Sequence, residues 1–278
     1  MVVGIVGLGL IGGSLAKAYK MHDGITVYGF DTDDAILEFA QIAGAIDGVL
    51  DENTTKLCDC ILIAINPKAA INYLKNAAHL ISSGTVVFDC CGVKKTVCDS
   101  CFEIAKEYGF TFVGAHPMAG IADSGFKHSR ANLFTDEVMV LVPPVFDDIA
   151  LLDKIDKLLK PAGFGHLKVT TADKHDATIA FTSQLAHVVS NAYVKSPEAT
   201  AHKGLSAGSY KDLTRVARLN PDMWAELFLE NGVELTKEID FLIKSLTEYR
   251  NAIDANDFVR LRDLLADGSR LKAEIDGL

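Results

Sequence analysis

A chain of 278 residues can hold one large domain or two ordinary ones, and its 49% hydrophobic and 23% charged residues are typical of a soluble globular protein. No apolar stretch reaches the roughly 18 residues of a membrane span, and the first residues lack the basic segment of a signal peptide, so we expect a cytoplasmic protein without a membrane partner. A formal net charge of −10 argues against nucleic acid as a partner, because clustered Lys and Arg hold polyphosphates. A small anionic substrate needs only a local cationic pocket and stays compatible with this charge.

The first part of the chain alternates short apolar runs with helical periodicity, which is the pattern of βαβ units around a parallel sheet. We predict strands at Val2–Val6, Thr26–Phe30, Cys60–Ile65, Thr85–Asp89, Phe112–Ala115, Val138–Val142 and Leu167–Val169. We predict helices at Leu10–Met21, Asp33–Ala43, Pro67–His79, Lys94–Tyr108 and 148–160. This order predicts an α/β fold, with a Rossmann-type, doubly wound parallel sheet forming a dinucleotide-binding domain over residues 1–171.

The character of the sequence changes after Thr171. No convincing strand follows, and apolar residues recur at helical spacing, most clearly in Val233–Ile253 and Phe258–Ile275. These long amphipathic segments present more apolar surface than one small domain covers internally. We therefore predict an all-helical C-terminal domain over residues 172–278 that forms part of the substrate site and mediates a homodimer.

Six cysteines lie between Cys58 and Cys101. Cys98 and Cys101 have the C-x-x-C spacing of zinc and redox sites, but the other four cysteines do not supply a second pair with that spacing. We interpret the cysteines as small apolar core residues and predict no metal site.

A glycine-rich turn, Gly7-Leu-Gly9-Leu-Ile-Gly12, follows the first predicted strand and opens a helix at Leu10. In a dinucleotide-binding turn, Gly7 would permit the tight bend, Gly9 would let the backbone approach a pyrophosphate, and Gly12 would let the helix pack against the strand. The pyrophosphate would lie at the helix N-terminus, where free N–H groups favour negative charge.

An acidic residue, Asp31, ends the second predicted strand 19 residues after Gly12. A carboxylate there accepts hydrogen bonds from ribose hydroxyls and repels a 2′-phosphate, so we predict NAD rather than NADP. The predicted cofactor contacts are Gly7, Gly9, Leu10, Ile11, Gly12 and Asp31, together with Ile65 and Pro67 at the end of the third predicted strand.

Three further motifs carry candidate chemistry. His116-Pro-Met-Ala-Gly120 follows a strand at the carboxyl edge of the sheet, where doubly wound folds bind ligands. Ser183-Gln-Leu-Ala-His187 lies in the first predicted helix of the second domain, and Lys211-Asp-Leu-Thr-Arg215 precedes Asn220-Pro-Asp-Met-Trp224 with the only tryptophan. Taken singly, a strand-end histidine, a helix histidine and two cations can each be structural or surface residues.

Together these motifs resemble the prephenate and arogenate dehydrogenase family along nearly the whole chain. The GLGLIGGS, AHPMAG, S-x-L-x-H and KDLTRVA…NPDMW segments occur in the order and approximate spacing of that family. The resemblance implies NAD-dependent oxidative decarboxylation of prephenate to 4-hydroxyphenylpyruvate, a step of tyrosine biosynthesis. It implies that His116 is the acceptor at the substrate 4-hydroxyl and that Arg215 binds a substrate carboxylate. The remaining substrate contacts implied are Lys211, His187, Ser183, Gly120 and Trp224.

The chain departs from the family pattern at three positions. After the strand that ends at Asp89, Gly92 takes the place of a serine that supports the catalytic histidine. Ala122, followed by Asp123, replaces a glutamate at the pocket mouth, and Gln184 replaces a second histidine. The first change bears on rate, and the other two bear on the choice between prephenate and arogenate, whose ammonium Asp123 could bind.

Three other functions fit parts of the pattern. An arogenate dehydrogenase would use the same scaffold. A different NAD-dependent dehydrogenase with a helical C-terminal domain, such as a β-hydroxyacid dehydrogenase or an imine reductase, would place a catalytic Lys or Asp on a long interdomain helix, and Ser183–His187 holds neither. A redox-sensing nucleotide-binding regulator would need a DNA or partner surface, which the acidic charge disfavours.

Overall fold

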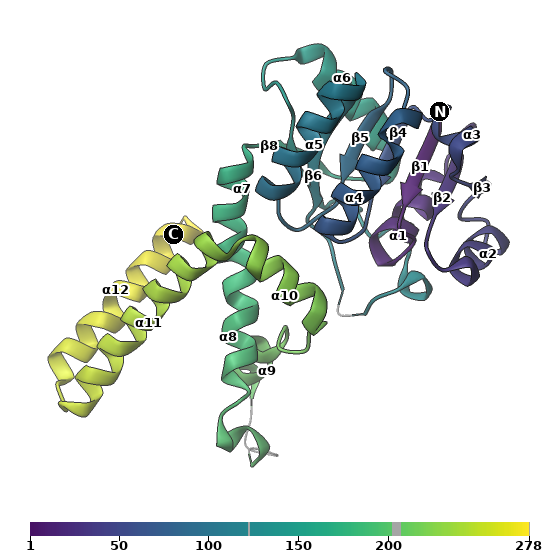
Figure 1. Ribbon diagram of the computed structural model, residues 1–278. Helices are drawn as coiled ribbons and strands as arrows, with labels where there is room; N and C mark the ends of the chain where they lie inside the picture. Colours follow the sequence, from purple (N-terminus) through teal and green to yellow (C-terminus); the bar gives the residue numbers. More distant parts are fainter. Residues whose placement is uncertain (122, 202–206, 278) are drawn as a thin grey trace.

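The computed structural model describes residues 1–121, 123–201 and 207–277 and contains one eight-stranded sheet followed by a helical region (Figure 1). The strand order is β3-β2-β1-β4-β5-β6-β7-β8, so the direction of winding reverses between β1 and β4. In doubly wound sheets, ligands bind at the carboxyl edge beside this reversal. Within the described residues, no helix is long and apolar enough to cross a bilayer.

The secondary structure of the sheet region follows the predicted order. The strands are β1 (Val2–Val6), β2 (Thr26–Phe30), β3 (Gly48–Val49), β4 (Cys60–Ile63), β5 (Val86–Asp89), β6 (Thr111–Pro117), β7 (Val138–Val142) and β8 (His166–Val169). The helices are α1 (Leu10–Tyr19), α2 (Asp34–Ile42), α3 (Glu52–Thr55), α4 (Pro67–Ala77), α5 (Lys95–Tyr108) and α6 (Ile149–Leu159). Short 3₁₀ turns occur at η1 (Ala78–Leu80), η2 (Phe126–His128), η3 (Lys160–Ala162) and η5 (Pro197–Thr200).

One strand pair departs from the predicted all-parallel sheet. β7 runs antiparallel to β6, with Gly114 opposite Val142 and Pro117 opposite Met139, whereas the other neighbouring pairs are parallel. The described part of the loop between these strands contains only a 3₁₀ turn, so the chain returns without the crossover helix that a parallel pair requires. The carboxyl ends of β1, β4, β5 and β6 still meet at one edge.

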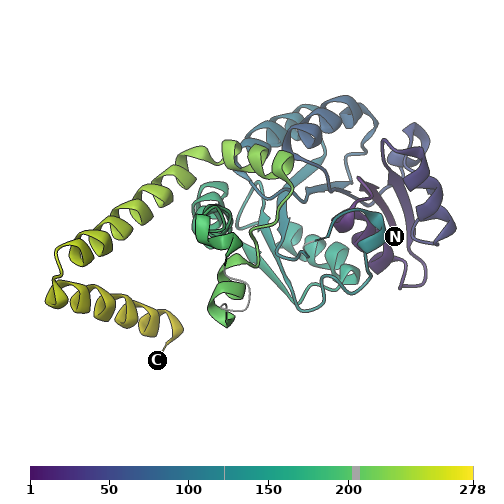
Figure 2. The ribbon, with the colours of Figure 1, turned by 90° about the horizontal axis from the view of Figure 1, so that it is seen from below.

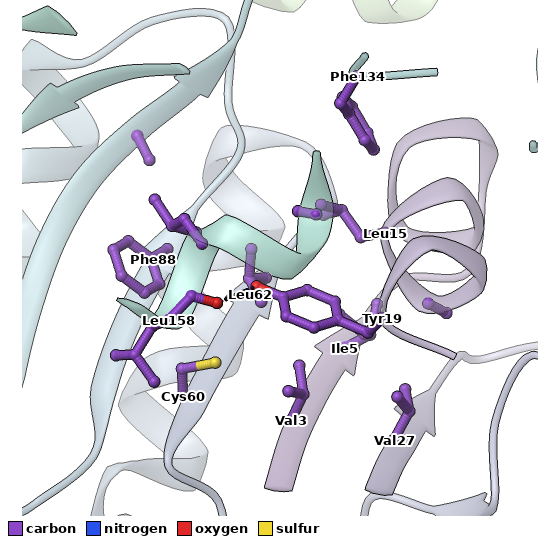
Figure 3. Close-up of a cluster of buried hydrophobic side chains, with 14 of the residues drawn as sticks. Val3, Ile5, Leu15, Tyr19, Val27, Cys60, Leu62, Phe88, Phe134 and Leu158 are labelled. Atoms are coloured by element: carbon purple, nitrogen blue, oxygen red, sulfur yellow. Dashed lines mark hydrogen bonds between the residues drawn. The ribbon is translucent and has the colours of Figure 1, made fainter. Parts of the chain in front are cut away.

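Helices cover both faces of the sheet and form two apolar cores. In β4, Leu62 packs into the core shared with α1 and α6, while Ile61 and Ile63 pack into the core shared with α4 and α5. Tyr19 is fully buried in the first core, and its phenol donates a hydrogen bond of 2.9 Å to the Leu158 carbonyl of α6 (Figure 3). This bond satisfies a buried hydroxyl and joins the two helices of that face.

The six cysteines are free thiols within or against these cores. Burial raises the pKa of Cys58 and of Cys101 to about 12, which keeps both thiols protonated and unreactive. Among the described residues, no group of three or more His, Cys, Asp or Glu side chains is arranged to hold a metal ion.

The helical region begins with a continuous rod formed by α7 (Ala172–Ile179), the π-helical turn η4 (Ala180–Leu185) and α8 (Ala186–Tyr193). It continues through α9 (Gly208–Thr214), α10 (Pro221–Glu230), α11 (Gly232–Asp254) and α12 (Phe258–Asp276). The last two helices form an antiparallel hairpin that projects away from the sheet (Figures 1 and 2). In the part of the chain that the structure describes, every regular element after β8 is helical, as predicted.

Candidate active site

The glycine turn connects β1 to α1 at the carboxyl edge of the sheet. Gly7 has a φ of +84°, and a Cβ there would lie 2.3 Å from Cγ2 of Ile65. A Cβ on Gly12 would lie 1.8 Å from the carbonyl oxygen of Gly7, so neither position admits a side chain. A Cβ on Gly9 would meet no heavy atom within 4 Å, which leaves its backbone open to a ligand. This geometry fits a turn that cradles a pyrophosphate.

Asp31 lies just beyond β2 and turns toward the glycine turn. One carboxylate oxygen accepts the main-chain N–H of Leu8 at 2.7 Å, and the other accepts that of Asp33 at 3.1 Å. A carboxylate has further lone pairs for ribose hydroxyls. Leu10 and Ile11 begin α1, Ile65 follows β4, and the buried Pro67 is the first residue of α4. The predicted cofactor residues therefore gather at the ends of neighbouring strands.

The imidazole of His116 is half-buried near the carboxyl end of β6. Its Nδ1 lies 2.9 Å from Nε2 of His175, a hydrogen-bonding distance. Burial lowers the pKa of His116 well below its usual value, and the nearby ammonium of Lys94 acts in the same direction. The ring is therefore neutral at neutral pH, which is the state a proton acceptor requires.

The buried pair His175 and Asp176, in α7, was not among the residues predicted to be functional. Nδ1 of His175 lies 2.6 Å from Oδ1 of Asp176. The same carboxylate accepts the main-chain N–H groups of Lys94 and Lys95, each at 2.8 Å, at the N-terminus of α5. Burial alone would raise the pKa of Asp176, but the hydrogen bonds from His175 and from these N–H groups lower it. The only sequence signal was a His-Asp pair at the start of the second domain.

A fully buried ion pair supports the strand that carries His116. The ammonium of Lys94 contacts the carboxylate of Asp89 and donates to the carbonyl oxygen of Ala115 at 2.6 Å. Asp89 also accepts the main-chain N–H of Ala115 at 2.9 Å. Burial is the largest single effect on Lys94 and lowers the pKa of the ammonium, but Asp89, the strongest of the neighbouring groups, acts in the opposite direction, and the net shift is upward. In the same segment, a Cβ on Gly92 would lie 3.5 Å from Leu227, an ordinary van der Waals distance. Steric crowding by Leu227 is therefore not the reason that glycine replaces the serine here.

The second domain contributes an aromatic stack. His187 and Trp224 lie face to face, with ring centroids 3.8 Å apart and an interplanar angle of 28°. Nδ1 of His187 donates to the Ser183 carbonyl at 2.8 Å. Burial and the neighbouring Arg215 lower the pKa of His187, although the bond to Ser183 opposes this shift. His187, Trp224 and Arg215 are thus brought together.

Two other predicted site residues do not contact His116. Lys211 lies in α9 and Gly120 lies in the loop after β6, and both are exposed. Within the described residues, neither of them forms a hydrogen bond or a ring contact with His116.

Gln184 was expected to bear on substrate choice, and the structure corrects this. Its side chain is 1% exposed, donates to the Leu227 carbonyl at 3.2 Å and accepts from Asn231 at 2.8 Å. Asn231 also donates to the Asp176 carbonyl at 2.9 Å. Gln184 therefore joins helices of the second domain, and its amide is not available to a substrate.

A cleft of about 260 Å³ lies between the loop after β6 and the segment after α9. Its lining residues are Asp123, Ser124, Lys127, His128 and Arg218. The preceding residue, Ala122, lies outside the described residues. Asp123 thus faces a lining with two permanent cations.

The two halves of the chain match two parts of one family. The family described as "Prephenate dehydrogenase, nucleotide-binding domain" matches residues 15–167, and "Prephenate dehydrogenase, dimerization domain" matches residues 171–267. The chain belongs to the prephenate dehydrogenase family. The resemblance inferred from the four motifs is confirmed.

Individual relatives are similar to this chain over most of its length. Prephenate dehydrogenase of Bacillus subtilis (strain 168) is 28% identical over 262 residues, which cover 91% of this chain and 70% of the relative. Prephenate dehydrogenase from A. aeolicus, solved with hydroxyphenyl propionate and NAD⁺, is 27% identical with a TM-score of 0.85, covering 99% of this chain and 98% of that one. Arogenate dehydrogenase from Synechocystis is 26% identical with a TM-score of 0.80, covering 98% of this chain and 99% of that one.

Proposed function

We propose that this chain is an NAD-dependent prephenate dehydrogenase, which converts prephenate to 4-hydroxyphenylpyruvate and carbon dioxide. The observation that carries the proposal is the placement of the His116 imidazole at the carboxyl edge of the sheet, with Nδ1 2.9 Å from Nε2 of His175. Its other nitrogen is left for a ligand. A hydroxyl that is being oxidised needs such an acceptor.

The cofactor would lie along the glycine turn. The open backbone at Gly9 and the N-terminus of α1 suit a pyrophosphate, and Asp31 suits the adenosine ribose. Bound NAD would supply the acceptor for the hydride that leaves the carbinol carbon of the substrate. The carboxylate of Asp31 would repel a 2′-phosphate, so we propose NAD rather than NADP.

The remaining chemistry falls to side chains of both domains. His116 accepts the hydrogen bond of the substrate 4-hydroxyl and polarises the O–H bond as hydride departs. The planar guanidinium of Arg215 binds a substrate carboxylate by paired charge-assisted bonds, with Lys211, Ser183 and Gly120 as further contacts. The stacked rings of His187 and Trp224 form one wall of the substrate pocket and exclude water from the ring of the bound substrate. Loss of the ring carboxylate as carbon dioxide then leaves an aromatic product.

The charges of the cleft at Asp123 favour prephenate over arogenate. Arogenate carries an ammonium where prephenate carries a keto group, and Asp123 is the carboxylate that could bind it. Lys127 and Arg218 line the same cleft, together with His128. Because two permanent cations outnumber the one carboxylate, this lining suits prephenate better than arogenate, whose ammonium offsets one of its two carboxylates.

A paired assay tests the proposal. The purified enzyme is mixed with NAD and with prephenate, arogenate or neither, and NADH formation is followed by absorbance. We expect the larger kcat/KM with prephenate and no NADH without substrate. A larger kcat/KM with arogenate would assign the other substrate, and no NADH with either would refute the proposed activity.

We also propose that the protein is a homodimer assembled through α11 and α12. The hairpin exposes large apolar side chains, and the following are each more than half exposed: Phe241, Ile243, Leu246, Phe258 and Val259. Exposed apolar patches of this kind mark interaction surfaces. The match of residues 171–267 to a dimerization domain supports a second copy of the chain as the partner.

A further inference from the structure

We infer that His175, held by Asp176, fixes the tautomer of His116 and thereby sets which ring nitrogen faces the substrate. The inference rests on the proposed function for the chemical meaning of that nitrogen. His175 is a positioning residue in this account, because it acts through His116 and does not touch the substrate.

The donor and acceptor of each hydrogen bond can be assigned in turn, starting from the Asp176 carboxylate. An ionised carboxylate only accepts, so Nδ1 of His175 carries the proton in its 2.6 Å bond to Asp176. Nε2 of a neutral His175 then holds a lone pair and can only accept. Nδ1 of His116, 2.9 Å away, must therefore be the donor. This leaves Nε2 of His116 without a hydrogen, as an acceptor.

With a neutral His175, each hydrogen bond between His116 and the Asp176 carboxylate has one donor and one acceptor. The Asp176 carboxylate is already balanced by the N–H groups of Lys94 and Lys95 at the N-terminus of α5. His175 is 3% exposed, so bulk water does not compete for these hydrogen bonds. A cationic His175 would reverse the bond to His116, so the tautomer of His116 reports which state is present.

The arrangement also connects the two domains. His116 belongs to the sheet, whereas His175 and Asp176 belong to α7 and are anchored to the start of α5. The tautomer is therefore set only when α7 is docked against the sheet domain. The logic matches that of a Ser-His-Asp triad, in which a carboxylate orients the imidazole for its partner.

The most direct test is ¹⁵N NMR of the histidine-labelled wild-type enzyme at neutral pH, without substrate. Comparison with His116→Asn assigns the signals of His116 among the eight histidines. We expect a protonated Nδ1 and an unprotonated Nε2. A protonated Nε2 on His116 would overturn the inference. Because no substrate is used, this outcome is independent of whether prephenate is oxidised.

Two variants test the consequence for turnover. His175→Leu removes the acceptor, and we expect kcat to fall at least about tenfold, a part of the usual worth of acid–base catalysis, with KM for prephenate and NAD nearly unchanged. His175→Gln supplies an amide oxygen toward His116 and an N–H toward Asp176, so it should restore most of kcat. Wild-type turnover in His175→Leu, or equal losses in both variants, would contradict the inference. If His175→Leu does not fold, the NMR measurement still decides.

Discussion

Lys94 and Asp89 form an ion pair that is sealed from solvent, with side-chain exposures of 0% and 1%. Both residues also bind the main chain of Ala115, the residue before His116. The pair thus fixes the backbone from which the proposed acceptor projects. Breaking one partner leaves the other as an uncompensated buried charge.

Replacing Lys94 by Met should therefore be strongly destabilising, by about 3–5 kcal/mol in the free energy of unfolding. Urea denaturation followed by circular dichroism measures this. The neighbouring Lys95 is a matched control, because its pair with Asp173 is exposed to solvent and its loss should change the free energy of unfolding far less. Equal losses in Lys94→Met and Lys95→Met would show that burial is not the cause.

His116→Asn should lower kcat by roughly 10²–10⁴ with little change in the KM for prephenate, because the acceptor acts mainly as hydride leaves. Steady-state kinetics with saturating NAD measure both constants. The exposed His166 on β8 provides the same substitution away from the site, and His166→Asn should behave as wild type.

The pH profile of the wild-type enzyme gives an independent view of His116. Protonation removes the acceptor, so kcat falls on the acid side. Burial and the nearby Lys94 ammonium lower the pKa of His116, so this fall should lie below the pH of about 6.5 at which an ordinary histidine titrates. An acid limb at or above that pH would contradict a depressed pKa.

Arg215→Ala should raise the KM for prephenate steeply with a smaller effect on kcat, since a carboxylate is bound in the ground state and in the transition state alike. The KM for NAD should be nearly unchanged. Arg262 on α12, which pairs with the neighbouring Asp263, offers the same change far along the chain. A selective loss of kcat in Arg215→Ala would assign the residue a different role.

Asp31 should decide the choice of cofactor. We expect the apparent affinity for NADP to be at least about tenfold weaker than for NAD, because a like-charge contact costs on the order of 1–3 kcal/mol. Asp31→Ser should narrow this gap, whereas Asp34→Ser, in the first turn of α2, should not. Equal KM values for the two cofactors in the wild-type enzyme would refute the role of Asp31.

Ile243→Lys should weaken the proposed dimer, since it places a charge on the apolar surface of α11. Ile42→Lys makes the same change at an 85% exposed position on α2, outside the hairpin, and should leave the dimer intact. Sedimentation velocity at micromolar concentration distinguishes the two states. A wild-type monomer, or a dimer unaffected by Ile243→Lys, would exclude this interface.

The sequence predicted the long elements well because their periodicity is local. The strands and helices of the sheet domain that were predicted agree with the structure within two residues at each end. β3 and α3 were not predicted, because segments of two and four residues are too short to show a period. The antiparallel direction of β7 was not predicted, because an apolar run does not specify whether the neighbouring strand is parallel.

The candidate site was likewise predicted only in part. The glycine turn was anticipated from its motif, and His187 and Trp224 were each expected at the substrate pocket, but their stacking was not predicted. The bond between His116 and His175 joins positions 59 residues apart in two domains, so it depends on how α7 docks. Gln184 was misread for the same reason, because only packing shows that its amide is consumed by Asn231 and Leu227.

The central claim is an oxidation coupled to decarboxylation, and it is tested most directly by measuring NADH and carbon dioxide in one reaction with prephenate labelled in its ring carboxylate. We predict equal amounts of NADH and labelled carbon dioxide, with 4-hydroxyphenylpyruvate as the product. NADH without carbon dioxide would indicate an ordinary alcohol dehydrogenase on this scaffold and would contradict the account.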